Sequence, residues 1–300
     1  ERTGGKVAFS SYFSAALMPG EEMLAGIGSG AAHMGELVTS YYPQELPVSN
    51  WQLQMGSLPS DSFPHGLMGG SAAVTELFVT SPPLVDEFAE HNLKSLTSGN
   101  FYQQFDLLCT KPIDSLADAQ GLRVRTAGPT WVAEVTHLGM VPVPLPLGEV
   151  YEALQRGVVD CAVGHAALNV DTGFWEVAKH YVPVSLSSAP GSTLVINMQT
   201  WNAMSAELQQ VFRDAAYTYW STQLRESLGR YTRFVEEGPG AQGVQVHDPR
   251  PLEEALAPFQ AQVIGNLVAN APASVTDPKG FIDGYEGLGE LFVFLFFGVV

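Results

Sequence analysis

Arg125 is the residue whose type and position most clearly indicate a binding function. It lies in the alternating stretch Leu122 to Thr126, LRVRT, of a chain with only 14 basic residues against 31 acidic ones. In a protein with a formal net charge of −17, an anion is attracted only by local positive groups. A guanidinium matches a carboxylate through two parallel hydrogen bonds. One arginine on a strand is most often a solvated side chain, but the scarcity of basic residues favours a role in binding an anion.

Glu149, Asn197 and Gln104 are further polar residues that either a ligand or the backbone could use. Glu149 begins the helical stretch GEVYEALQRG, where it is either a favourable charge at a helix start or a brace for the arginine. Asn197 stands in the apolar strand STLVINM and Gln104 in FYQQFDLLC. Because a buried amide requires partners, each of the two either caps nearby backbone or binds a ligand.

Catalytic and metal-binding motifs are absent from the sequence. The seven histidines are scattered without an HxxxH pair, and there is no GxSxG, GxxxxGK[ST] or GxGxxG motif. Cys109 and Cys161 lie in apolar, strand-like runs without the spacing of a metal site. This favours two buried thiols and leaves a disulfide between them open. We therefore expect neither an enzyme nor a bound metal.

Length and composition bound the class of protein. Three hundred residues can form one large domain or two of moderate size, and a hydrophobic content of 46% is ample for a packed core. The acidic balance argues against nucleic acid as a partner, because its phosphates require a basic surface. The apolar stretch 291–300, LFVFLFFGVV, is about half as long as a bilayer span, which favours a buried terminal segment.

The elements that must position Arg125 lie between Gly121 and Val163. Two apolar strands, at 122–126 and 141–145, flank a segment with helical spacing from Trp131 to Leu138. This α/β pattern places Arg125 at the carboxyl end of a strand, which is where open α/β sheets bind ligands.

Other stretches predict how this unit is connected to the rest of the chain. A long strand at 101–110 suggests a crossing between two domains, and the helical spacing from Ser205 to Phe234 predicts a helix of ~45 Å that could run along both. Lys6 to Tyr12 alternates like a strand. Residues 47–70 are rich in Pro, Ser and Gly, which favours a surface excursion.

The run GLRVRTAGPTWVAEVTHLGMVPVPLPLGEVYEALQRGVVD is preceded by KPIDSLADAQ and followed by FWEVAKHYVPV and INMQTWNAMSAELQQVFRDAA. With these residues the chain resembles the extracytoplasmic solute-binding proteins of tripartite ATP-independent periplasmic (TRAP) transporters. The resemblance implies an α/β, two-domain, periplasmic-binding-protein-like fold with a ligand cleft between the domains, crossing strands and a long domain-spanning helix. Domain I is then expected at 1–108 plus about 199–246, and domain II at 109–198 plus about 247–300.

The same resemblance implies roles for individual residues. Arg125 matches the arginine that binds the substrate carboxylate in the family, and Asn197 and Gln104 match an asparagine and a glutamine. The oxo-acid-binding branch uses a Glu-aromatic pair together with a cation, but residues 161–165, CAVGH, hold no such pair. We therefore expect no cofactor, with a ligand-associated cation as the alternative, and expect His165 to donate to the ligand instead.

Aromatic residues near the expected cleft favour a hydrophobic or aromatic acid as ligand. Trp131 and Trp175 lie on helical apolar faces, which favours core packing. Of the adjacent pair Tyr41 and Tyr42, only Tyr42 is taken as a site residue.

These features predict a periplasmic protein that captures a small organic acid and delivers it to the membrane permease of a TRAP transporter. The expected partners are the carboxylate ligand and the permease subunits, and the protein is expected to be a monomer or a homodimer. A ligand-binding sensor domain of the same fold, signalling through a partner, is one alternative, and an enzyme with an α/β cleft is another. The expected site residues are Arg125, Asn197, Gln104, Glu149, His165 and Tyr42.

Overall fold

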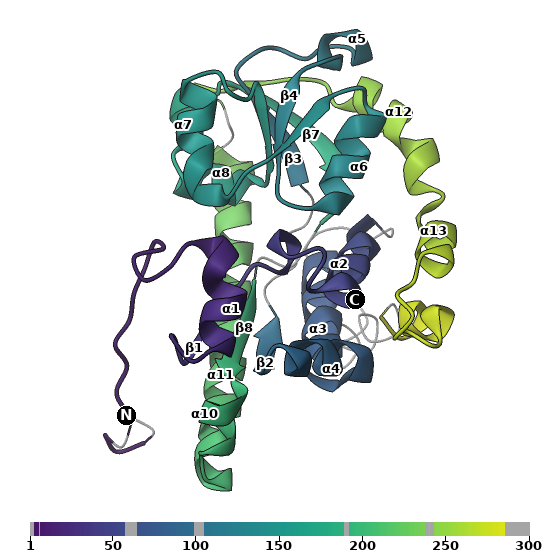
Figure 1. The fold of residues 1–300 in the computed structure, drawn as a ribbon. Coiled ribbons are helices and arrows are strands. Elements are labelled where there is room, and N and C mark those ends of the chain that lie inside the picture. The colour runs from purple at the N-terminus through teal and green to yellow at the C-terminus, as the bar shows by residue number, and fades with distance from the viewer. Residues whose placement is uncertain are drawn as a thin grey trace.

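The computed structural model describes residues 3–5, 7–57, 65–98, 105–188, 192–237, 240 and 243–285. In this part of the chain the strands form two separate sheets. Figure 1 shows one sheet in each of two lobes, with a long helix beside the lower lobe that reaches the upper one. We call the lobe with the three-stranded sheet domain I and the lobe with the six-stranded sheet domain II.

Domain I is built on the strand order β1-β8-β2. The central strand β8 (Thr193–Asn197) pairs antiparallel with β1 (Met34–Leu37) and with β2 (Leu93–Ser98). Large side chains such as Phe78 and Phe88 are fully buried in its core, which supplies the main driving force for folding. Among the helices that contribute to this core are α1 (Met23–Gly28), α2 (Pro47–Leu53), α3 (His65–Thr80) and α4 (Pro82–Glu90).

Domain II is built on the strand order β5-β4-β6-β3-β7-β9. Its strands are β3 (Phe105–Cys109), β4 (Arg123–Thr126), β5 (Val141–Pro144), β6 (Cys161–Gly164), β7 (His180–Leu186) and β9 (Gln245–Val246). The strand β4 runs parallel to both of its neighbours, β5 and β6. The carboxyl ends of these three strands therefore meet at one edge of the sheet.

Side chains alternate between the two faces of this sheet and meet different helices. Val124 and Val163 pack with α6 (Pro129–His137) and α12 (Arg250–Gln260). Ala162 and Leu108 belong to a second core with α7 (Val150–Gln155) and α9 (Phe174–Val177). Both faces are thus covered, and only the edges of the sheet remain for a ligand.

The helix α11 (Ala206–Glu237) is 32 residues long and connects the two lobes. Its first turn is capped by Ser205, whose Oγ accepts a hydrogen bond from the backbone N–H of Leu208 at 3.2 Å. The helix contacts β2 in domain I and α8 (Ala166–Asp171) in domain II. An ion pair of 2.6 Å between Arg230 and Asp171 joins it to α8. The expected domain-spanning helix is therefore confirmed.

Short elements complete the described structure. They are the 3-10 turns η1 (Gly20–Glu22), η2 (Thr39–Tyr41), η3 (Gln54–Ser57) and η4 (Leu147–Glu149), and the helices α5 (Leu116–Ala119), α10 (Met198–Asn202) and α13 (Val263–Ala269).

The chain crosses between the lobes at other points than the sequence indicates. The strand β3 lies wholly in the sheet of domain II, and β8 lies in the sheet of domain I, because each is hydrogen-bonded to that sheet on both sides. The short strand β9 pairs with β7 in domain II. After α12 the chain returns to domain I, where Val263 and Leu267 of α13 are buried.

Two segments also differ locally from the sequence-based expectation. Residues 7–13 form no strand, and residues 47–53, expected in a surface excursion, form the buried helix α2. Pro47 stands in the first turn of this helix, where a missing N–H costs nothing.

Cys109 and Cys161 form a disulfide rather than two buried thiols. They lie directly opposite each other on the antiparallel strands β3 and β6. A cross-link between residues 52 positions apart removes unfolded-state freedom worth about 4 kcal/mol in the chain-entropy model. Such a bond is typical of proteins from oxidising compartments. Within the described ranges, no helix is long and apolar enough to cross a membrane.

Candidate functional site

Arg125 lies at the carboxyl edge of the domain II sheet, held by the two neighbouring strands. Its Nε donates to the carbonyl oxygen of Leu145, just after β5, at 2.9 Å. Its Nη1 donates to the carbonyl oxygen of Val163 in β6 at 3.4 Å. A guanidinium has five N–H donors, so these two bonds orient the group and leave other donors available.

The guanidinium of Arg125 is buried without an acidic partner. The residue is 3% exposed, and none of the ion pairs found in the described ranges includes it. Burial lowers the pKa of Arg125, and the nearby Tyr41 side chain raises it again in part. Arginine nevertheless stays protonated in proteins. A buried, unpaired cation is costly, so an external anion would stabilise this arrangement.

Tyr41, rather than Tyr42, reaches this edge of domain II from domain I. The Tyr41 hydroxyl accepts a hydrogen bond from the backbone N–H of Leu147 at 3.0 Å. Tyr42 is 5% exposed in the core of domain I, where its hydroxyl donates to the carbonyl of Gly20 and accepts from the N–H of Leu24. No local pattern distinguishes the two adjacent tyrosines, and the structure assigns the contact between domains to Tyr41.

His165 follows β6 directly and lies near the same edge. Burial lowers its pKa to about 3, with a smaller contribution from the charge of Arg230. The ring is therefore neutral at physiological pH. Its Nδ1 accepts a hydrogen bond from the N–H of Leu168 at 3.1 Å, so the ring hydrogen is on Nε2. This tautomer is a donor, as the expected role in binding an acid requires.

The structure brings neither Asn197 nor Glu149 to the guanidinium of Arg125. The Asn197 Oδ1 accepts from the N–H groups of Gln199 and Thr200, and its Nδ2 donates to the carbonyls of Ile27 and Gly28. This is the backbone-capping alternative, since all of these bonds go to backbone.

Glu149 is exposed at the N-terminal end of α7 and forms no ion pair with Arg125. Its position is that of a favourable charge at a helix start. Gln104 lies outside the described residues.

Other buried side chains near the site have polar atoms without hydrogen-bond partners. They are Thr126 at the end of β4, Thr130 at the start of α6, and Asn169 in α8. Gln52, in α2 of domain I, has the same property at both polar atoms of its amide. Only burial in three dimensions distinguishes these residues from the many exposed polar ones, so the sequence carried no signal for them.

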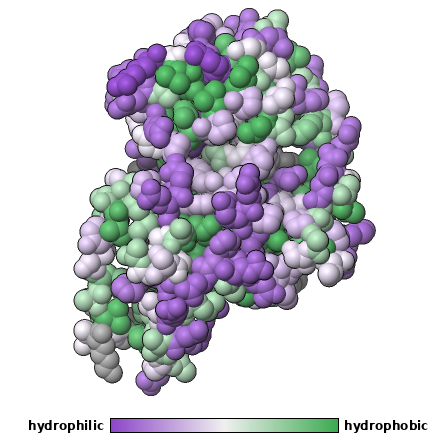
Figure 2. Space-filling model, in the orientation of Figure 1, coloured by the Kyte–Doolittle hydropathy of each residue, from purple (hydrophilic) through white to green (hydrophobic). Residues whose placement is uncertain are grey.

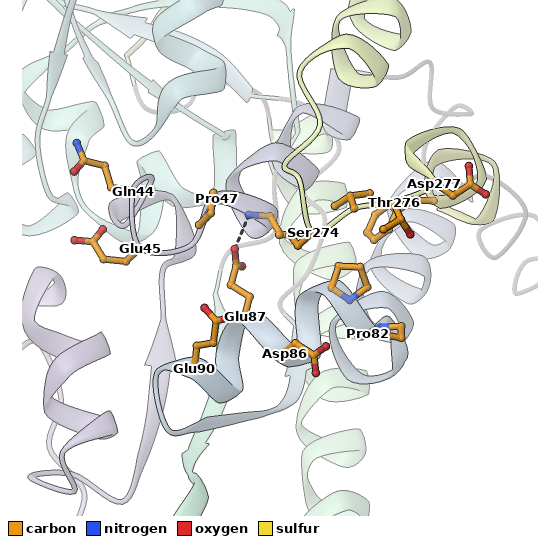
Figure 3. A pocket seen from close by; sticks show the side chains of 14 residues that line it. Gln44, Glu45, Pro47, Pro82, Asp86, Glu87, Glu90, Ser274, Thr276 and Asp277 are labelled. Carbon is orange, nitrogen blue, oxygen red and sulfur yellow. Dashed lines mark hydrogen bonds between the residues drawn. The ribbon is translucent and has the colours of Figure 1, made fainter.

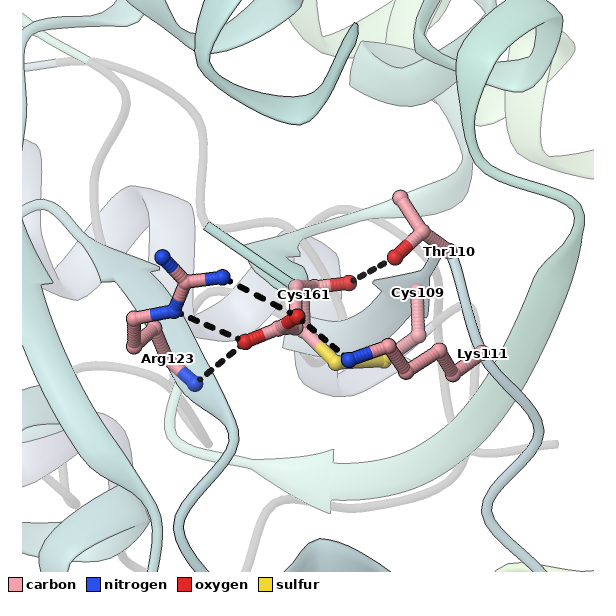
Figure 4. A network of polar contacts seen from close by, with 6 residues as sticks. Cys109, Thr110, Lys111, Arg123 and Cys161 are labelled. Carbon is pink, nitrogen blue, oxygen red and sulfur yellow. Dashed lines mark hydrogen bonds and ion pairs between the residues drawn. A yellow bond between two sulfur atoms is a disulfide. The ribbon is translucent and has the colours of Figure 1, made fainter. Parts of the chain in front are cut away.

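Arg123, two residues before Arg125, forms a saturated network (Figure 4). The Asp160 carboxylate accepts hydrogen bonds from the backbone N–H and the Nε of Arg123, each at 3.0 Å, and from the Nη2 of Arg123 at 3.2 Å. Lys111 adds a fourth bond to Asp160 at 2.8 Å. The Arg123 side chain is 44% exposed. These contacts account for Arg123 as a structural residue.

A groove of about 670 Å³ lies in domain I, between α2, α4 and residues 274–281 (Figure 3). Its lining carries the carboxylates of Glu45, Asp86, Glu87, Glu90 and Asp277. So many acids on one groove would repel an anion, and Arg125 is not among its lining residues. Within the described ranges, no cluster of three metal-ligating side chains is found.

Figure 2 shows the surface of the two lobes with an indentation between them. The hydrogen bond from the Leu147 N–H to Tyr41 joins the two domains. Further bonds join the domains there. The N–H and Oγ of Ser188 both donate to the carbonyl of Gly56, the first at 3.1 Å. The site is therefore one charged edge of domain II covered by a surface of domain I.

Comparison with known proteins gives a family match along most of the chain. The model of the bacterial extracellular solute-binding protein family 7 matches residues 1–265. A monocarboxylate 2-oxoacid-binding periplasmic protein of Nostoc sp. is 25% identical over 239 residues, which cover 75% of this chain and 60% of the Nostoc protein. The ectoine-binding periplasmic protein of Halomonas elongata is 31% identical over 170 residues, 56% of this chain and 47% of that protein. The chain thus spans less than two thirds of these relatives.

Solved structures share the fold. A marine-metagenome TRAP solute-binding protein in complex with pyroglutamate superposes with a TM-score of 0.80 at 22% identity, covering 95% of this chain and 89% of that one. A solute receptor of Bordetella pertussis that binds pyroglutamic acid gives a TM-score of 0.78 at 21% identity, with 95% and 90% covered. The two-domain fold expected from the sequence is confirmed.

Proposed function

Because this chain belongs to the bacterial extracellular solute-binding protein family 7, we propose that it captures a small carboxylic acid outside the cytoplasmic membrane. It delivers the acid to the permease of a TRAP transporter and does not transform it. The names of similar proteins give a 2-oxoacid, ectoine and pyroglutamate as ligands, and all of these compounds carry a carboxylate.

The observation that carries the proposal is the buried guanidinium of Arg125. It is 3% exposed, fixed by the carbonyls of Leu145 and Val163, and without an acid in the described structure. A ligand carboxylate supplies the missing negative charge and accepts the remaining N–H donors in a paired geometry. The neutral His165 lies at the end of the neighbouring strand, with its ring hydrogen on Nε2.

Closure of domain I over this edge completes the binding mode. The bond from Leu147 to Tyr41 and those from Ser188 to Gly56 join the two domains at this edge and support such an arrangement. Closure removes water from the ion pair and so strengthens it. The acid is held by Arg125 without a cation in this mode.

The test is a thermal-shift screen of small acids followed by calorimetry on the wild type and Arg125→Ala. The acid that binds best raises the melting temperature, because a ligand at about 100 Kd adds ~2.7 kcal/mol of stability. Losing one partner of a buried ion pair costs about 3–5 kcal/mol, so Arg125→Ala weakens binding at least a hundredfold. Unchanged affinity in the variant would contradict the role of Arg125, and turnover of the bound acid would contradict the assignment as a binding protein.

A further inference from the structure

Asn169 has a buried side-chain amide that the described part of the chain leaves unsatisfied. The residue is 0% exposed. Neither its Oδ1 nor its Nδ2 has a hydrogen-bond partner. Its backbone is regular, with the N–H donating to the carbonyl of His165 at 3.0 Å. The fold therefore fixes where this amide lies without using it.

The Asn169 amide lies beside the strand end that holds Arg125. A Cβ placed on Gly164 would be 2.9 Å from the Asn169 Oδ1. Gly164 is the residue after Val163, whose carbonyl accepts the Arg125 Nη1. The φ angle of Gly164 is not positive, so a larger residue is excluded by the amide rather than by backbone conformation. The glycine leaves space for the Asn169 side chain next to the strand end that holds Arg125.

Leaving such an amide unpaired is unfavourable, which calls for a partner from outside the chain. A buried polar group without a hydrogen bond costs about 1–3 kcal/mol, and native structures hold few of them. The amide offers an acceptor at Oδ1 and two donors at Nδ2. A ligand group satisfies both only if it can donate and accept, as an amide or a hydroxyl can.

Two buried hydroxyls, at the end of β4 and at the start of α6, also lack partners in the described residues. Thr126, the residue after Arg125, is 0% exposed, and Thr130 at the start of α6 is 8% exposed. The Oγ1 atoms of both also have no partner. Side chains alternate along β4, so Thr126 faces the opposite side of the sheet from Arg125. Of these unsatisfied residues, Asn169 is therefore the one that lies on the Arg125 side of the sheet.

We propose that Asn169 is a specificity-determining residue that recognises a second, neutral polar group on the acid held by Arg125. The ligand is then a small carboxylic acid that carries an amide or hydroxyl close to its carboxylate. This replaces the hydrophobic or aromatic acid favoured by the sequence. The inference rests on the proposed function, since it presumes that Arg125 binds the carboxylate.

Matched pairs of acids test this role. In one pair, pyroglutamate is compared with cyclopentanecarboxylate, which has the same ring size and no amide. In the other, lactate is compared with propionate, which lacks the hydroxyl. Calorimetry on the wild type should show a preference of about 10- to 100-fold for the polar member of at least one pair. In Asn169→Leu, of similar size, the preference should fall to about one, while affinity for the hydrocarbon member stays the same or rises.

The ratio of affinities separates recognition from a structural effect, because misfolding would weaken both members alike. Asn169→Ala provides a second variant if the leucine is not accommodated, and circular dichroism confirms the fold of each. A wild type without preference, or a preference that survives in a folded variant, overturns the role of Asn169 while leaving acid binding intact. A wild type that binds no acid in the pairs or in the wider screen overturns the proposed function as well.

Discussion

Arg123 and Arg125 lie two residues apart on β4 and have opposite surroundings. The Arg123 side chain is 44% exposed and makes a full set of bonds to Asp160, which also binds Lys111. Arg125 is 3% exposed, and in the described part of the chain its hydrogen bonds go to neutral oxygens, the carbonyls of Leu145 and Val163 and the hydroxyl of Tyr41. Among the described residues, the exposed arginine, which water could have solvated, has an acidic partner, and the buried one has none.

The difference shows how a residue's place along a strand determines its use. Arg123 is the first residue of β4, at the opposite end of the strand from the carboxyl edge. Its hydrogen bonds there hold Asp160 against the sheet. Arg125 is one residue from the carboxyl end, where ligands of open α/β sheets bind. Where a cation holds the fold together, the chain supplies its anion. In the proposed binding mode, the ligand supplies the anion for Arg125.

The largest effect on stability that separates the two arginines is expected for Asp160→Ala. This change removes every acidic contact of Arg123 and Lys111 without touching Arg125. Loss of several charge-assisted hydrogen bonds should lower the free energy of unfolding by about 2–3 kcal/mol, measured by urea titration. The affinity for the acid should stay within twofold of the wild type. A large loss of affinity in the folded variant would show that the Arg123–Asp160 network also supports ligand binding, and that the two arginines do not have separate roles.

Protonation of Asp160 at low pH should also lower the free energy of unfolding. The bonds from Arg123 and Lys111 hold its pKa well below the usual range. A carboxyl with a lowered pKa in the folded state contributes stability at neutral pH that is lost as pH falls. Below about pH 4, where the unfolded carboxyl titrates, the free energy of unfolding should therefore fall less steeply with decreasing pH in Asp160→Ala than in the wild type.

Glu134 extends the comparison to a buried acid that has partners but no cation. Its carboxylate accepts from the N–H and Oγ of Ser187, the latter at 2.6 Å, in the segment that leads from β7 towards domain I. Burial raises the pKa of Glu134 to about 7, more than these bonds lower it. The folded protein thus keeps a proton that the unfolded chain releases above about pH 4.5.

The stability of the wild type relative to Glu134→Gln should therefore fall as pH rises from about 5 to about 7 and stay level above. One proton limits the slope to about 1.4 kcal/mol per pH unit. Urea titrations of both proteins at half-unit intervals measure it. Parallel curves for the two proteins would show that Glu134 ionises normally in the folded state.

The smallest effect is expected from the two adjacent tyrosines. Tyr41→Phe removes one hydrogen bond between the domains and a contact with Arg125. Calorimetry should show about fivefold weaker acid binding, the worth of one hydrogen bond. Tyr42→Phe removes bonds inside domain I and serves as the matched control, with lower stability and unchanged affinity. The opposite pattern would place Tyr42 at the ligand after all.

The sequence predicted the framework of the site because that framework is periodic. Alternation in LRVRT and helical spacing from Trp131 onward report the faces of β4 and α6, and these faces follow from burial alone. The position of Arg125 at a strand end could therefore be predicted from the sequence. The role of Asn197 was not, since a cap for α10 and a ligand contact need the same amide in the same place.

The partners of the framework depend on contacts between distant segments, which no local pattern records. Tyr41 meets Leu147 across 106 positions, and α2 was hidden in a stretch rich in turn-forming residues because Pro47 can also begin a helix. The amide of Asn169 is notable because no hydrogen-bond partner lies near it in the described structure. Such absences become visible only when the whole fold is assembled.

Calorimetric titration of the same acid into the wild type, Arg123→Ala and Arg125→Ala tests the central claim most directly. The acid is the one that gives the largest shift in the thermal screen, and all three proteins are first shown to be folded. We predict that Arg123→Ala binds within twofold of the wild type, whereas Arg125→Ala binds at least a hundredfold more weakly. Equal losses in the two variants, or no loss in Arg125→Ala, would contradict the assignment of Arg125 as the residue that binds the carboxylate.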